Sequence, residues 1–374
     1  MDNVTKRKSK LAAAFALCPA AHAVALISGA LIAAQFILRR DHALMARWSE
    51  GCIRPLHASL AGALSAFNFS MAEVLIALAA LAVVARIAVG LLRLLRGRGS
   101  WRGAYRLFMQ LAALALFVYA GFSVLWGVYY YGDDFAEKSG LEAAPISVQE
   151  LERVTRYFAG LANEYGALVP RDERGLYVAD REDILNKSVE LFDATLDEFP
   201  CLAGPRVAAK PVYFSRVLSY LDFTGFFFPF TGEANVNTDF PPGLFASTVA
   251  HELSHQRGVA KEQEANFAAV LTCLNYGDAD YCYSAALLAY THLGNALYSA
   301  DYEAWEGIYA SLDENIKKDF ANDRAYWRQF ETPVQSVSNS VYEGFLYSYE
   351  QTLGLKSYGA CVDLLVDYYI TRCE

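Results

Sequence analysis

Residues 244–271 read LFASTVAHELSHQRGVAKEQEANFAAVL, and the apolar spacing in this segment predicts two successive helices. The first helix begins after the turn signal Pro-Pro-Gly at residues 241–243 and reads as a buried helix. Gly258 can supply the left-handed turn that ends it, and a second helix begins near Lys261. This turn folds the second helix back towards the first.

The first helix carries the run His251-Glu252-Leu253-Ser254-His255. A helix turns about 100° per residue, so His251 and His255 project from one face and can bind one metal ion. Glu252 lies beside that face, where it can take a proton from a metal-bound water and deliver it to a leaving amine. A surface histidine pair could share this spacing without a metal, but the buried helix favours a hydrolytic zinc site.

A catalytic zinc ion needs a third protein ligand, and the second helix offers Glu262 and Glu264. The two lie about 200° apart around a helix, so at most one of them faces the metal. Glu262 shares its face with small residues and with Asn266, which could orient a carboxylate by a hydrogen bond. We therefore favour one Zn²⁺ per chain, bound by His251, His255 and Glu262, with Glu264 as the alternative ligand.

Three longer segments of the chain form a recognisable set: residues 228–237 (FPFTGEANVN), 251–258 (HELSHQRG) and 262–267 (EQEANF). Together they resemble a bacterial membrane family catalogued as domain of unknown function 3810. Shorter segments at residues 48–51, 69–73 and 356–359 extend the resemblance over most of the chain. The resemblance implies a membrane-bound zinc metallopeptidase.

The order Glu262, Ala265, Asn266 is also similar to the Glu-x-x-Ala-Asp element of Ste24/HtpX-type membrane zinc peptidases. In that element the first Glu binds the metal, which supports Glu262. This chain has Asn266 where the element has Asp, so the likeness between the families is an analogy. A third ligand of this kind implies a zincin-like fold of the gluzincin type.

Residues 11–38, 74–95 and 107–131 form apolar runs long enough to cross a hydrocarbon core of about 30 Å. The first and third contain no Asp, Glu, Lys or Arg. The second is interrupted by Arg86, near the end expected to face the cytoplasm, where an arginine can reach the headgroups. We predict three transmembrane helices in a multi-pass protein of the cytoplasmic membrane.

Basic residues predict the orientation of these helices. Lys and Arg precede the first run and fill the connection between the second and third, so both segments should stay inside. Three crossings then give a membrane domain over residues 1–131 and an extracytoplasmic domain over residues 132–374. Residues 1–131 carry 14 Lys+Arg and 4 Asp+Glu, which leaves a net charge of −19 for the outer domain. So acidic a domain should not bind nucleic acid.

The outer region has a mostly helical pattern. A capping box at residues 147–150 begins a helix towards Leu168, and Asp180 begins another towards Phe199. Further helices are predicted over residues 283–298, 302–312, 317–330, 335–352 and 358–372. Residues 210–239 are richer in aromatic and β-branched residues with Gly and Pro, which suggests a small sheet.

The last piece of this sheet, residues 231–238, is predicted to be an edge strand just before the His-Glu-x-x-His helix. In zinc peptidases of this type such an edge binds the substrate in extended form. We therefore predict five substrate-binding residues: Glu233, Ala234, Asn235, Val236 and Asn237. An ordinary structural strand is the alternative.

Tyr283 and His292 lie on a predicted helix, and either could polarise a scissile carbonyl by donating a hydrogen bond. Ordinary packing is the alternative for both. The sequence thus predicts a membrane-anchored zinc peptidase, with Glu252 as general base, the lipid bilayer and a peptide or protein substrate as partners, and no signal for an oligomeric state. The alternative is a non-catalytic membrane receptor or scaffold that uses the metal site for sensing or structure.

Overall fold

The computed structural model describes residues 13–141, 146–349 and 358–373. It confirms the predicted class, a mainly α chain with one small sheet and three long apolar helices near the N-terminus. The chain divides into two compact units, Met1–Trp48 with Ala72–Gly132, and Ser49–Met71 with Asp133–Glu374. The chain therefore enters the second unit twice.

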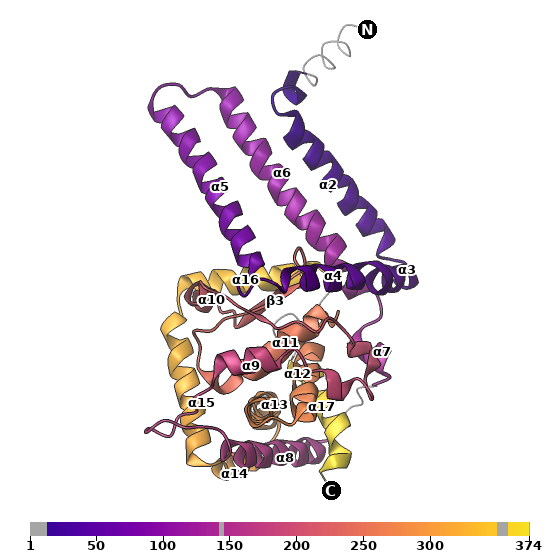
Figure 1. The fold of residues 1–374 in the computed structure, drawn as a ribbon, viewed down its shortest axis with the longest axis vertical. Helices are drawn as coiled ribbons and strands as arrows, with labels where there is room; N and C mark the ends of the chain where they lie inside the picture. The colour runs from indigo at the N-terminus through magenta and orange to yellow at the C-terminus, as the bar shows by residue number, and fades with distance from the viewer. Residues whose placement is uncertain (1–12, 142–145, 350–357, 374) are drawn as a thin grey trace. The chain divides into compact units, whose positions relative to one another are not determined.

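The long apolar helices are α2 (Pro19–Leu38), α5 (Met71–Leu95) and α6 (Trp101–Leu125), each long enough to cross a membrane. α2 and α6 pack along each other (Figure 1). α6 begins before the predicted Leu107 because Ser100 caps it, with the Ser100 hydroxyl accepting a 3.2 Å hydrogen bond from the Gly103 N–H. After α6 the chain forms the 3-10 turn η2 (Gly127–Tyr131), so the predicted third span ends early. The short helix α3 (His42–Trp48) packs against this turn.

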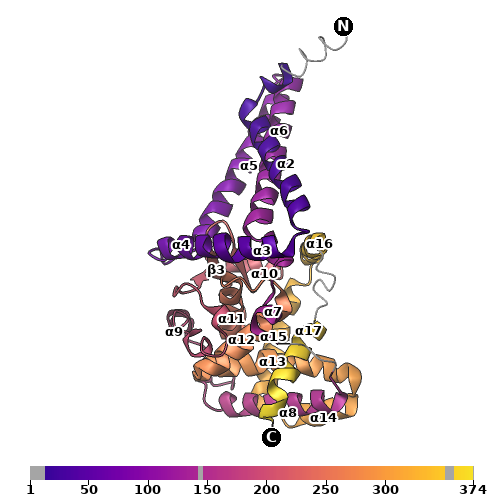
Figure 2. The same cartoon turned by 90° about the vertical axis from the view of Figure 1, so that its right-hand side faces the viewer.

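The second unit consists mostly of helices. They are α4 (Arg54–Leu64), α7 (Phe135–Ser139), α8 (Val148–Gly166), α9 (Arg181–Lys187), α10 (Ser215–Tyr220), α11 (Phe245–Gln256), α12 (Glu262–Tyr276), α13 (Ala279–Ala300), α14 (Tyr302–Ala310), α15 (Glu314–Trp327), α16 (Pro333–Ser348) and α17 (Tyr358–Tyr369). Figures 1 and 2 show α13 in the middle of this unit, with α8, α12 and α17 around it. The core includes the fully buried side chains of Phe158, Phe245, Phe267 and Tyr281, one each from α8, α11, α12 and α13.

The predicted caps of two helices are present. The Ser147 hydroxyl accepts from the Glu150 N–H at 3.2 Å, and the Glu150 carboxylate accepts from the Ser147 N–H at 2.7 Å. Asp180 caps α9, but that helix ends at Lys187 and does not continue to Phe199 as predicted. The hydroxyl of Ser188 donates to the Leu185 carbonyl at 2.6 Å, a local bond that competes with continued helix.

The sheet has three strands, β1 (Lys210–Pro211), β2 (Gly225–Phe228) and β3 (Glu233–Val236), in the order β1-β3-β2. β3 pairs in parallel with β1 and antiparallel with β2, so it is the central strand. The prediction that residues 231–238 form an edge strand is therefore wrong. The alternation of residues within β3 cannot reveal this: β2 precedes it directly, but its second neighbour, β1, ends at Pro211, well before β3 begins at Glu233.

The segment Ser49–Met71, which the predicted domain ranges assign to the membrane part, packs with the second unit. Lys138 Nζ lies 2.6 Å from Glu50 Oε1, and Arg54 donates to the Cys201 carbonyl at 2.7 Å. At the other end of the segment, Ser70 Oγ lies 2.6 Å from Asn235 Oδ1. These contacts join residues more than 80 positions apart, which explains why apolar runs alone do not predict them.

Candidate metal centre

The two helices predicted from residues 244–271 are α11 and α12, and they pack against each other. α11 ends at Gln256, and Gly258 follows with a φ of +87°, the left-handed conformation that favours glycine. α12 begins at Glu262 and runs back along α11. The turn thus brings Glu262 opposite the two histidines.

Three potential metal-binding atoms converge at this point. Glu262 Oε2 lies 3.2 Å from His251 Nε2 and 3.7 Å from His255 Nε2, and all three atoms lie within 4.8 Å of one another. Glu264 turns elsewhere, since its carboxylate accepts a 2.9 Å hydrogen bond from the Phe135 N–H. The structure therefore brings together the favoured set of residues and separates the alternative from it.

Each histidine is held through its other ring nitrogen. His251 Nδ1 lies 2.8 Å from Asn266 Oδ1, and His255 Nδ1 lies 2.7 Å from the Val259 carbonyl oxygen. Both partners are acceptors, so Nδ1 carries the proton and Nε2 faces Glu262, an arrangement typical of metal-binding histidines. Asn266 thus orients a histidine, whereas the sequence suggested that it would orient a carboxylate.

The charges at this point are strongly coupled. Burial lowers the pKa of the His255 imidazole, but the adjacent Glu262 carboxylate outweighs this effect and raises the pKa to about 9. Burial raises the pKa of Glu262, but His255 and His251 outweigh it and hold that pKa well below its usual value. The carboxylate therefore favours a positive charge beside it, which a divalent metal ion would supply.

Tyr342 contacts the other oxygen of the same carboxylate. This half-buried residue of α16 donates a 2.7 Å hydrogen bond from its hydroxyl to Glu262 Oε1. Its ring packs edge-on against Phe223, with centroids 5.4 Å apart. Sequence reasoning missed Tyr342, because a residue 80 positions beyond Glu262 has no spacing signal that connects it to the site.

Glu252 is buried beside the convergent atoms and is not among them. Burial raises the pKa of its carboxyl to about 7. Among the residues that the structure describes, its Oε2 has no hydrogen-bond partner. Gly225 at the start of β2 passes directly over it, and a Cβ at that position would lie 2.6 Å from Glu252 Oε1. Only glycine allows this close approach; a Gly within a strand pattern is the signal that could have indicated it.

The structure separates the two residues predicted to polarise a carbonyl. His292 is buried on α13, where burial and then the nearby His251 lower its pKa to about 4. Tyr283 donates to Asp319 Oδ2 at 2.5 Å and accepts from Arg171 at 3.3 Å. Tyr283 and His292 are separated by about 180° around the helix and by about 13 Å along its axis. Tyr283 is therefore a packing residue of another cluster and not part of this site.

The predicted substrate-binding residues are buried structural residues in this fold. Glu233 accepts from the Met71 N–H at 3.3 Å, and Asn237 donates to the Ser219 hydroxyl at 2.9 Å. Ala234 and Val236 are also buried, and β3 is paired on both sides. The role predicted for residues 233–237 needs an edge strand, whereas β3 is the central strand of the sheet.

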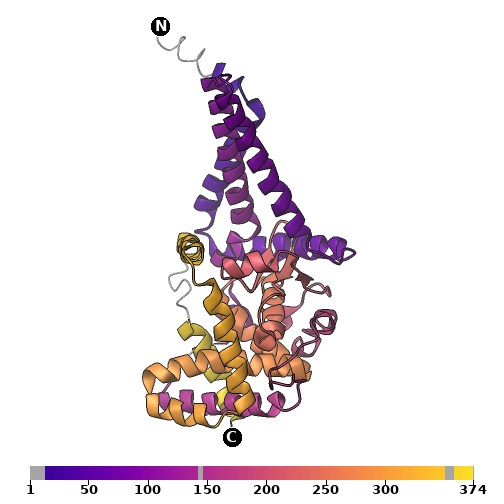
Figure 3. The same ribbon diagram turned by 90° about the vertical axis from the view of Figure 1, so that its left-hand side faces the viewer.

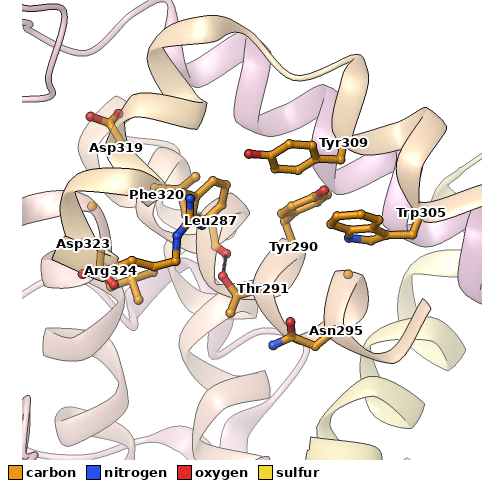
Figure 4. Close-up of a pocket in the computed structure, with 13 residues that line it drawn as sticks. Leu287, Tyr290, Thr291, Asn295, Trp305, Tyr309, Asp319, Phe320, Asp323 and Arg324 are labelled. Carbon is orange, nitrogen blue, oxygen red and sulfur yellow. Dashed lines mark hydrogen bonds between the residues drawn. The ribbon is translucent and has the colours of Figure 1, made fainter. Parts of the chain in front are cut away.

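A cavity of about 260 Å³ lies away from this site, between α13, α14 and α15 (Figure 4). Its walls include the aromatic rings of Tyr290, Trp305, Tyr309 and Phe320. Tyr290 and His292 are about 200° apart around α13, so the cavity opens on the other side of that helix from His292. It contains none of the convergent residues and is a separate feature of the unit.

The chain thus combines three helices that are apolar enough to cross a membrane with a mainly helical unit that carries a His-Glu-x-x-His cluster. The chain belongs to the family described as "Protein of unknown function (DUF3810)", whose sequence profile matches residues 48–366. The resemblance to this one family, seen in the sequence, is thereby confirmed. No curated protein and no solved structure matches the chain.

Proposed function

We propose that this protein is a zinc-dependent metallopeptidase whose metal ligands are His251, His255 and Glu262. The observation that carries the proposal is the convergence of two Nε2 atoms and one carboxylate oxygen within 4.8 Å, with both Nδ1 atoms held by fixed acceptors. Two imidazoles and one carboxylate are a ligand set that catalytic zinc sites use. When bound, zinc lowers the pKa of a coordinated water and polarises the carbonyl of a peptide.

Glu252 would move the protons in this reaction. Its buried carboxylate lies beside the ligand set, and its pKa of about 7 suits a group that must accept and then release a proton near neutral pH. It would take a proton from the attacking water and give it to the leaving amine. Gly225 leaves the space that the carboxylate needs for both steps.

The outer strand β2, at the position of Gly225, is the place where we propose that the substrate binds. β2 pairs with β3 so that Phe226 faces Asn235 and Phe228 faces Glu233, and Asn237 N–H donates to the Thr224 carbonyl at 2.9 Å. The alternation of an antiparallel pair then directs the main-chain groups of Gly225 away from β3. Within the described part of the chain no strand pairs with this edge. An extended peptide bonded there would pass beside Glu252.

The direct test is metal-dependent cleavage by the full chain in lipid nanodiscs, with a broad peptide library as substrate. We expect cleavage that a chelator reduces to background and that added Zn²⁺ restores, because removing the metal removes both water activation and carbonyl polarisation. Peptide mapping by mass spectrometry measures it. Zinc binding without any cleavage across the library would instead favour the receptor or scaffold.

We also propose that the second unit lies on the outer side of the cytoplasmic membrane. In intact cells, an impermeant thiol reagent should label a cysteine placed at the exposed Glu303 and should not label one placed at Arg98, in the basic connection between α5 and α6. The exposed native Cys52 is replaced by Ser in both variants. Labelling at Arg98 with protection at Glu303 would reverse the orientation.

A further inference from the structure

Helix α16 has two faces of different character. On the inner face, Tyr342 donates to Glu262 at 2.7 Å. On the outer face, Val334, Val337 and Val341 are 54%, 64% and 67% exposed. Their spacing of three and four residues places them in one row along the helix. Valine side chains exposed in a row, unlike single exposed ones, indicate a surface that meets another apolar phase.

More exposed apolar side chains lie next to α16. Ser338 donates to the Leu221 carbonyl at 2.9 Å, so α16 is fixed on the turn that follows α10. Phe214, just before α10, and Val217 within it are both more than half exposed. Exposed apolar side chains are therefore also present on the element next to α16.

The loop before α5 extends this surface. Phe67 and Phe69 are exposed, and the loop is fixed to the sheet because Lys210 Nζ donates to the Phe67 carbonyl. Within the second unit, α4, α10 and α16 lie at the same end, opposite α8 and α14 (Figures 1 to 3). We call this end, with the exposed side chains of α16, α10 and the loop at residues 65–70, the apolar end.

We propose that the apolar end of the second unit rests on the surface of a lipid bilayer, with the valine row of α16 among the lipids. The chain itself points to this partner. Met71, whose N–H donates to Glu233 of β3 at 3.3 Å, is also the first residue of α5, a helix apolar enough to cross a membrane. The covalent chain therefore leaves the apolar end directly into a candidate membrane span. A helix that lies in the interface with its apolar face among the lipids is a known mode of membrane contact.

This proposal goes beyond the peptidase function and does not depend on it. If both proposals hold, the lipid contact of α16 also helps to position Tyr342 at Glu262, because the valine row and Tyr342 belong to the same helix.

The test uses the full chain in phosphatidylcholine vesicles, with Cys52 replaced by Ser and an environment-sensitive fluorophore on one new cysteine at a time. The positions are Val334, Val337 and Val341, with Tyr302 as control. Tyr302 begins α14 at the opposite end of the unit and is similarly exposed, at 52%. Because all four positions are exposed, each labelled chain should keep the melting temperature of the parent.

We expect a blue-shifted emission and quenching by nitroxide-bearing lipids at the three valine positions, and quenching only by a water-soluble agent at Tyr302. Equal access of the water-soluble agent to the valine positions and to Tyr302 would overturn the proposal. The result is independent of zinc and of cleavage. Lipid quenching with no peptidase activity would therefore retain this proposal and reject the proposed function, and the reverse result would do the opposite.

Discussion

Replacing Glu252 with Gln should lower peptide cleavage by about 10² to 10⁴-fold, the usual effect of losing a general base, while zinc content stays unchanged. The Gln side chain has almost the same shape, so it fits the space under Gly225 that a larger group would not. Glu252 is not one of the three convergent groups, which is why zinc should remain. Initial cleavage rates and metal analysis on the same preparation measure both effects.

Glu264 provides a matched control for this experiment. It is a second buried glutamate of the same helix pair, and burial raises the pKa of its carboxyl to about 7 as well. Its carboxylate, however, accepts from the Phe135 N–H, a bond that the amide oxygen of Gln can keep. Glu264→Gln should therefore cleave nearly as fast as the parent. Equal rates for the Glu252→Gln chain and the parent would reject catalysis and favour the receptor or scaffold.

The helix pair at the site could be predicted from sequence because its determinants are local. The spacing of His251 and His255, the glycine that ends α11 and the 200° separation of Glu262 and Glu264 all follow from helix geometry within a few residues. For the same reason the three apolar helices were predictable, since length and hydropathy are local properties. Short-range geometry was enough to choose Glu262 as the residue that faces the histidines.

The rest of the site depends on contacts between distant parts of the chain. Tyr342 reaches Glu262 from α16, and Gly225 passes over Glu252 from β2, and neither position stands at a fixed spacing from the helix pair. The central place of β3 depends on its second neighbour, β1, because the four-residue strand looks alike whether one neighbour is present or two. The segment Ser49–Met71 belongs to the second unit partly through a distant partner as well, since Lys138 pairs with Glu50.

Replacing Glu262 with Ala should remove most of the bound zinc, whereas Glu264→Ala should keep about one zinc per chain. The reason is geometric, since among the described residues only Glu262 places a carboxylate oxygen within 4 Å of both histidine Nε2 atoms, at 3.2 and 3.7 Å. His251→Ala and His255→Ala should lose zinc in the same way. Metal analysis after gel filtration of the full chain measures the content, and thermal unfolding shows whether each variant remains folded.

Replacing Asn266 should weaken zinc binding only partly, in contrast to the nearly complete loss expected when a ligand is replaced. Its Oδ1 holds His251 Nδ1 at 2.8 Å without itself facing the metal position, so Asn266→Ala should weaken zinc binding by roughly 10- to 100-fold and not abolish it. Competition with a coloured chelator can resolve such a difference. An Asn266→Asp chain should bind zinc at least as well as the parent, because a carboxylate accepts the same hydrogen bond and adds negative charge near the cation.

Loss of zinc in Glu264→Ala with retention in Glu262→Ala would show that Glu264 is the ligand. The metal would then bind to a different arrangement of α11 and α12, one that brings Glu264 to the two histidines.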